Sequence, residues 1–126
     1  MRKILAVIVA IIFCSTTSYA QYKAVFMGDS IFDSWDSTKH GGHPEFFTDN
    51  GFLNRGKSGQ VTAQMLERFE RDVIANSPEA VIICAGTNDI AENYGKIDMA
   101  KTFGNIVSMC DLAKANGIRP IICSVI

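Results

Sequence analysis

Short apolar runs that alternate with helix-like segments are the feature that most constrains this chain of 126 residues. Two of the runs are continuous, Ala24–Met27 and Ala80–Ala85, and each is followed by glycine. A third run covers residues 120–126, and Gly51–Asn54 is a weaker candidate. Continuous apolar runs of this length are typical of strands that are buried on both faces of a sheet.

The segments between the runs have helical spacing instead. One predicted helix has apolar residues at every fourth position and charged residues on the opposite face, and it stops at Asn76-Ser77-Pro78. Its apolar face holds Val61, Met65, Phe69 and Val73, and its charged face holds Glu67, Arg68, Glu70 and Arg71. A second helix is predicted up to the stop at Asn116-Gly117, with Met99, Phe103, Ile106, Cys110 and Ala113 on its apolar face.

Residues 31–50 have no clear period, and we predict only a turn or two of helix around Pro44–Phe47. Strands that alternate with helices of this length predict the α/β class, with a parallel sheet and right-handed crossovers. We find no linker or internal repeat, so the pattern indicates one small domain.

Small and polar residues follow the first three predicted strands. The three loops are Gly28–Ser30, Asn54–Gly59 and Gly86–Asp89. In an open parallel sheet such loops lie at the carboxyl edge, where these folds bind their ligands. A strand order of 2-1-3-4 would make the three loops neighbours, with Ser30 in the middle.

A serine at such an edge is a candidate nucleophile. Its hydroxyl needs an adjacent base and donors for an oxyanion. The candidate donors are the backbone N–H of Ser30, a glycine N–H between residues 54 and 59, and the side-chain amide of Asn88. Glycine suits this role because the missing Cβ lets the backbone approach a substrate.

At these residues the sequence resembles the SGNH, or GDSL, hydrolase superfamily. The resemblance implies a flavodoxin-like α/β/α fold and ester hydrolysis through an acyl-serine, with no metal and no cofactor. It places the nucleophile at Ser30 and the oxyanion donors at Ser30, Gly59 and Asn88. If the second strand were shifted by a few residues, Gly56 would replace Gly59.

The family pattern is incomplete in these 126 residues. Its base and orienting acid come from an Asp-x-x-His block, and no such block is present. The only histidines, His40 and His43, lie beside Gly41-Gly42 and suggest a flexible loop; with no Cys or carboxylate cluster nearby, a metal site there is disfavoured. We therefore expect a domain cut short before its last strand and closing helix, and inactive alone.

The first twenty residues are predicted to be a signal peptide. Arg2 and Lys3 precede an unbroken apolar run of ten residues, 4–13. Ser18-Tyr19-Ala20 then has the small-x-small pattern of a cleavage site. Ten apolar residues are too few to span a hydrocarbon core about 30 Å thick. An exported product is expected, periplasmic, at the cell surface or secreted, with the partial hydrolase domain at residues 21–126.

The charge of residues 21–126 limits the classes of partner that this chain can bind. Ten basic and thirteen acidic side chains remain there, a formal net charge of −3. A basic nucleic-acid-binding surface is therefore excluded. Three cysteines remain, Cys84, Cys110 and Cys123, and because all lie in apolar runs we expect them to be buried and unpaired.

Several side chains allow two interpretations. Asp29 and Asp89 either contact substrate or cap loops and helices, and we favour capping. The aromatic residues Trp35, Phe46 and Phe47 either line an acyl or sugar pocket or belong to the core, and we favour the core.

Two functions fit the sequence. The first is an exported serine esterase acting on short-chain acyl or acetyl esters, acetylated glycans among them. The second is a non-catalytic relative that binds a glycan or a partner protein.

Overall fold

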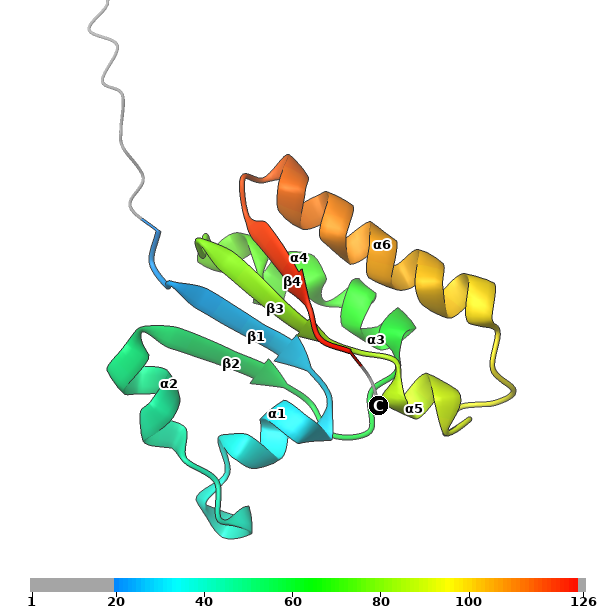
Figure 1. The fold of residues 1–126 in the computed structure, drawn as a ribbon, viewed down its shortest axis with the longest axis horizontal. Helices are drawn as coiled ribbons and strands as arrows, with labels where there is room; N and C mark the ends of the chain where they lie inside the picture. The colour runs from blue at the N-terminus through cyan, green and yellow to red at the C-terminus, as the bar shows by residue number, and fades with distance from the viewer. Residues whose placement is uncertain (1–19, 125–126) are drawn as a thin grey trace, which may run out of the picture.

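The computed structural model describes residues 20–124 and contains one parallel sheet of four strands (Figure 1). The order of the strands is β2-β1-β3-β4. This order confirms the predicted α/β class and the predicted place of the first strand between the second and the third. The strands are β1 (Ala24–Gly28), β2 (Phe52–Gly56), β3 (Ala80–Cys84) and β4 (Arg119–Ile122).

The register of the strands brings their carboxyl ends together. Gly28 at the end of β1 lies opposite Gly56 of β2 and Cys84 of β3. The loops that follow these three residues therefore leave the sheet at one edge. This shared edge is what the sequence predicted from the small-residue loops.

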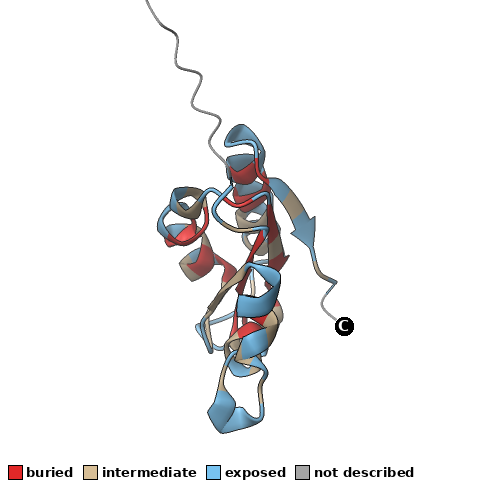
Figure 2. Cartoon of the chain, turned by 90° about the vertical axis from the view of Figure 1, so that its left-hand side faces the viewer, coloured by how far each residue is buried: buried red, intermediate tan, exposed pale blue. Residues whose placement is uncertain are grey.

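One face of the sheet packs against α3 (Thr62–Glu67), α4 (Phe69–Asp72) and α6 (Met99–Ala115). The core on this face is apolar and almost free of solvent, as Figure 2 shows for the central strands. Its fully buried members are Val25, Met27, Met65, Phe69, Val73, Val81, Ile83, Met109 and Ala113.

The opposite face packs against α1 (Ser30–Trp35) and α2 (Pro44–Asn50), which lie over the β1–β2 half of the sheet (Figure 1). Aromatic rings fill this layer around Phe26 of β1. Trp35 stacks on Phe46 with ring centroids 4.7 Å apart, and Phe47 is buried. The core interpretation of these aromatic residues is therefore confirmed, and the two helical layers complete an α/β/α sandwich.

The structure corrects the predicted helix over residues 61–73. This segment is divided at Arg68, whose backbone leaves helical geometry with φ −98° and ψ 1°. After α4 the chain forms a 3-10 turn, η2 (Ile74–Asn76). Arg68 was placed on the charged, exposed face, but only 6% of the residue is exposed. The division turns this side chain inward, and a regular helix would not.

The structure also differs from the sequence-based expectations in the second strand, in the segment after Ser30 and on the apolar face of α6. The second strand extends to Gly56, so residues 54–56 belong to β2 and not to the loop. The segment after Ser30, for which no helix was predicted, forms α1, followed by a second 3-10 turn, η1 (Thr38–His40). On α6, Met99 and Phe103 were expected in the core but are exposed, because the helix extends beyond the sheet edge at its first turns (Figure 1).

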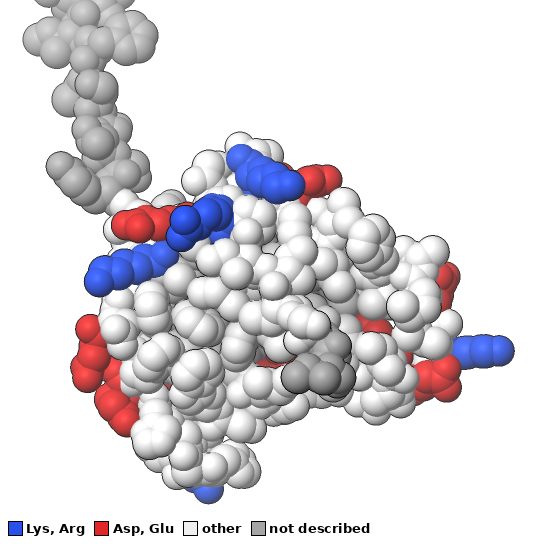
Figure 3. Space-filling view, in the orientation of Figure 1, with Lys and Arg blue, Asp and Glu red and all other residues white. Residues whose placement is uncertain are grey.

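The surface carries few charges on the face viewed in Figure 1. Most of the Lys, Arg, Asp and Glu side chains lie around its rim in Figure 3, and the centre is mostly uncharged apart from a small acidic area. The predicted signal peptide lies outside the described residues, apart from Ala20. Among residues 20–124, no helix has the length and apolarity needed to cross a bilayer.

Gly56 is a position where a side chain is excluded. A Cβ there would lie 2.3 Å from the Asp33 backbone nitrogen and 2.7 Å from the Phe32 carbonyl carbon, so α1 packs directly on the β2 backbone. We predict that Gly56→Ala lowers the free energy of unfolding by about 1–3 kcal/mol, because backbone atoms must move apart.

The matched control is Gly104→Ala on α6, where nothing lies within 4 Å of the added Cβ. This change should stabilise the protein by about 0.5–1 kcal/mol through helix propensity. Urea denaturation measures both. Equal effects of the two substitutions would contradict the close packing of α1 on β2.

Candidate active site

Ser30 lies at the carboxyl edge of the sheet, as the first residue of α1 directly after β1 and Asp29. Asp29 is 1% exposed, and its Oδ1 accepts a hydrogen bond of 3.0 Å from the Ile31 N–H. This bond caps the amino end of α1 and confirms the capping interpretation of Asp29. Ser30 itself is half-buried and lies directly after this capping residue.

Asn88 lies beside this turn, in the short helix α5 (Thr87–Ile90) that follows β3. Its Nδ2 donates to the second carboxylate oxygen of Asp29 at 3.3 Å and to the Gln60 carbonyl oxygen at 3.0 Å. Its Oδ1 accepts from Asn93 Nδ2 at 2.6 Å. One buried amide therefore joins all three loops at the sheet edge.

The second loop is tied to its neighbours through the two residues before Gly59. The Lys57 N–H donates to the Gly28 carbonyl oxygen at 3.0 Å. Both the backbone N–H and the hydroxyl of Ser58 donate to Asp33 Oδ2 of α1, at 3.0 and 2.5 Å. Gly59 has φ +78°, a conformation that favours glycine, and a Cβ added there would meet nothing within 4 Å.

The two candidate glycines differ in their contacts. The Gly56 N–H donates to the side chain of Asn54 at 2.7 Å, and its backbone is packed against α1. Within residues 20–124, no protein acceptor takes the Gly59 N–H. The two glycines therefore differ in that the Gly56 N–H already donates within the protein.

Asp89 belongs to the scaffold. Its carboxylate accepts from the backbone N–H and the hydroxyl of Thr62, at 2.9 and 2.6 Å, and from the Thr102 hydroxyl at 3.2 Å. Because Thr62 begins α3 and Thr102 lies in α6, Asp89 holds both helices against the third loop. Asp89 therefore caps the first residue of α3, a neighbouring helix, and this agrees with the capping interpretation.

Arg68 is a buried side chain at the site that the sequence analysis misassigned. Its guanidinium donates to the Gly28 carbonyl oxygen at 3.1 Å, to Gln60 Oε1 at 2.6 Å and to Asp72 Oδ2 at 2.8 Å. The four-residue spacing from Arg68 to Asp72 was the available signal, since such pairs meet on a helix. Through its hydrogen bonds to Gly28 and Gln60, Arg68 holds the first loop and the end of the second loop in position.

Asp72 balances this buried positive charge. Burial acts to raise the pKa of Asp72, but hydrogen bonds and charges from Arg71 and Arg68 outweigh it and lower the pKa below its usual value. A carboxylate with a lowered folded-state pKa stabilises the protein above the unfolded pKa, about 3.9. That contribution is lost as the pH falls through the folded value.

The two histidines lie away from Ser30. Both histidines come after the end of α1, whereas Ser30 is its first residue. The six residues of this helix span about 9 Å at 1.5 Å per residue. The His43 backbone N–H donates to the Trp35 carbonyl oxygen at 2.7 Å, and its exposed ring contacts Glu45 at 2.8 Å. Within residues 20–124, no side chain forms a hydrogen bond with the Ser30 hydroxyl, and no trio of His, Cys, Asp or Glu is grouped for a metal.

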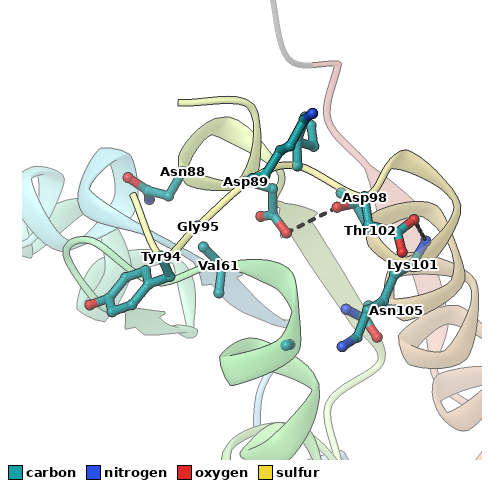
Figure 4. Close-up of a pocket in the computed structure, with 12 residues that line it drawn as sticks. Val61, Asn88, Asp89, Tyr94, Gly95, Asp98, Lys101, Thr102 and Asn105 are labelled. Carbon is teal, nitrogen blue, oxygen red and sulfur yellow. Dashed lines mark hydrogen bonds between the residues drawn. The ribbon is translucent and has the colours of Figure 1, made fainter. Parts of the chain in front are cut away.

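A cavity of about 240 Å³ opens beside Asn88, between the third loop and α6. Figure 4 shows Asn88 and Tyr94 at one end of it and Lys101 and Asn105 of α6 at the other. Tyr94 is 67% exposed, so its ring is open to contact. The cavity thus combines an aromatic ring with amide and ammonium donors.

The parallel sheet, the two helical layers and the serine, glycine and amide at one edge define a domain of the SGNH type. The sequence profile of the GDSL-like lipase/acylhydrolase family matches residues 26–126. The chain belongs to this family.

Two solved structures share more than half of the aligned residues with it. A GDSL-like lipase from Bacteroides thetaiotaomicron is 51% identical, with a TM-score of 0.77 over 84% of this chain and 50% of that chain. A structure from Bacteroides fragilis is 54% identical, with a TM-score of 0.73 over 79% of this chain and 46% of that chain. The chain thus spans about half the length of these proteins.

A curated relative is the uncharacterized lipoprotein YqeF of Bacillus subtilis. It is 32% identical over 77 residues, which cover 59% of this chain and 32% of the relative.

The buried Arg68–Asp72 pair gives a stability prediction. Arg68→Met removes the buried donor to Asp72, Gln60 and the Gly28 carbonyl while Arg71 stays paired with Asp72, so we expect a loss of about 1.5–3 kcal/mol in unfolding free energy. Arg71→Met is the control, because Arg71 is exposed and should cost far less. Chemical denaturation compares the two, and similar losses would show that Arg68 does not occupy the buried position.

Proposed function

We propose that this chain carries the nucleophile and the oxyanion donors of an exported serine esterase acting on short-chain acyl or acetyl esters. The observation that carries the proposal is the network that joins Asp29, Asn88 and Gln60. Through it the amide of Asn88 lies beside the turn that bears Ser30. A hydroxyl and fixed neutral donors at one edge are what acyl transfer requires.

The proposed reaction begins with attack of Ser30 Oγ on the ester carbonyl carbon. Negative charge then develops on the carbonyl oxygen, where the N–H groups of Ser30 and Gly59 and the amide of Asn88 donate. Asn88 Nδ2 donates to Asp29 at 3.3 Å and to Gln60 at 3.0 Å, so donation to an oxyanion would replace the longer bond, that to Asp29. Loss of the alcohol leaves an acyl group on Ser30, and water releases the acid.

The step also needs a base for the Ser30 proton, and neither histidine of the described residues lies beside the hydroxyl. The family resemblance implies an Asp-x-x-His block for this role. The two Bacteroides structures are about twice as long as the matched segment, so they have room for such a block. We propose that the base comes from outside these 126 residues and that the chain alone is a poor catalyst.

The cavity beside Asn88 supports a small, polar substrate. Tyr94 offers a flat apolar ring, and Lys101 and Asn105 offer donors, a combination suited to a sugar or another hydroxylated alcohol. Export is supported by the basic, apolar and small-residue pattern of residues 1–20. The name of the Bacillus relative, a lipoprotein, agrees with an extracytoplasmic protein.

The competing function is a non-catalytic module that binds a glycan or a partner protein. It is favoured by one observation, the lack of a base beside Ser30 in residues 20–124. The two functions differ in whether Ser30 is needed once a base is supplied.

A chimera tests this difference. We predict that the chain alone hydrolyses p-nitrophenyl acetate at close to the rate of its Ser30→Ala variant, because general-base assistance worth about 10²–10⁴ in rate is missing. Fusing the chain to the unmatched half of the Bacteroides thetaiotaomicron relative should restore turnover that depends on Ser30.

Ser34→Ala is the matched control in the chimera, since Ser34 lies in the same helix but follows the site by a turn. It should retain activity. A folded chimera with equal rates for the parent and for Ser30→Ala would exclude Ser30 as nucleophile and favour the binding module.

A further inference from the structure

Cys84 and Cys123 face each other across β3 and β4 near the carboxyl edge. Ile83 lies opposite Ile122, and the Cys123 N–H donates to the Ile83 carbonyl oxygen at 2.9 Å, which extends the ladder past the last paired residue. The next residue pair in this register is Cys84 and Cys123. Opposite residues of a parallel pair point to the same face, and both thiols pack against the aromatic layer under α1 and α2.

The backbone geometry of this pair admits a covalent link. Neighbouring strands lie about 4.8 Å apart. That spacing falls within the separation of about 4.4–6.8 Å found between the Cα atoms of disulfide-bonded cysteines. We propose that Cys84 and Cys123, which are free thiols here, form a reversible disulfide when the protein meets a small-molecule disulfide such as oxidised glutathione.

The exchange proceeds in two balanced steps. The more exposed thiol, Cys123, attacks oxidised glutathione as its thiolate, forms a mixed disulfide and releases one glutathione thiolate. The Cys84 thiolate then attacks the Cys123 sulfur and releases the second glutathione. Two protein thiols are oxidised, one glutathione disulfide is reduced, and the two protons end on the glutathione thiols.

The link should be easily reduced. In a parallel pair the two Cβ atoms are separated by nearly the strand spacing, whereas a relaxed disulfide has Cβ atoms about 3.5–4.5 Å apart. Such a bond is strained, and strained disulfides are the labile ones. The pair is therefore suited to respond to redox conditions.

The second step should be slow at neutral pH. Burial, with Cys123 and Asp29 as neighbours, raises the pKa of the Cys84 thiol to about 11. Only a small fraction is then thiolate near pH 7, and that fraction grows about tenfold for each pH unit until the pKa is approached. Gly28 lies opposite Cys84 in the register, so the link would lie next to the turn that carries Asp29 and Ser30.

The test uses the whole chain with Cys14→Ser, which leaves the three described thiols. The protein is incubated with defined ratios of oxidised to reduced glutathione, quenched with an alkylating agent and mapped as peptides without reduction. We expect a Cys84–Cys123 linked peptide about tenfold more abundant than any link to Cys110. Dithiothreitol should remove it.

Single substitutions give the controls. Cys110→Ser should leave the linked peptide unchanged, because Cys110 lies on α6 at the other face of the sheet. Cys84→Ser should stop the reaction at glutathione bound to Cys123. Circular dichroism checks that each variant is folded.

Two results would overturn the proposal. One is glutathione on Cys123 of the parent protein with no linked peptide from pH 7 to pH 9, and the other is preferential linkage to Cys110. The experiment measures a covalent bond and not esterase activity. The disulfide proposal can therefore fail or succeed independently of the proposed function.

Discussion

The carboxylate of Asp29 is the constraint on which the candidate site depends. It is buried at the end of the central strand β1, and a buried carboxylate is stable only when its oxygens accept hydrogen bonds. One oxygen caps α1 and the other accepts from Asn88. The first requirement orients the turn that bears Ser30, and the second holds the third loop against it.

The remaining polar contacts extend this arrangement to the second loop. Asn88 also donates to the carbonyl of Gln60, whose side chain accepts from the buried guanidinium of Arg68. Arg68 in turn donates to the Gly28 carbonyl, one residue before Asp29. The contacts form a closed circuit, so each loop is positioned by the other two. A preorganised set of donors costs little reorganisation when charge develops on a substrate.

The fold was largely predictable because its signals are local. Continuous apolar runs at 24–27 and 80–85 marked the central strands, and the glycine-led loops after them marked the carboxyl edge. The weaker run at 51–54 was predicted to end two residues too early, because Arg55 and Gly56, which follow Asn54, are not strand-favouring residues. All three are held in β2 by pairing with β1 and, at Asn54, by a bond to the Phe32 carbonyl.

The parts that escaped prediction depend on contacts between distant residues. Helical spacing assigned Arg68 to a solvated face, whereas its partners Gly28 and Gln60 draw it inward and divide the helix. Sequence alone also left Gly56 and Gly59 as alternatives. The structure shows that α1 packs against the backbone of Gly56, whereas nothing lies within 4 Å of a Cβ added at Gly59, and the choice of Gly59 as donor stays a proposal.

A double-mutant cycle between Asp29 and Asn88 tests the central claim most directly. The unfolding free energies of Asp29→Ala, Asn88→Ala and the double variant give the coupling between the two side chains. A hydrogen bond to a buried carboxylate predicts a coupling of about 1–3 kcal/mol. Additivity within about 0.3–0.5 kcal/mol, as expected for Asp29 with the distant Asn50, would show that this carboxylate does not hold the first and third loops together.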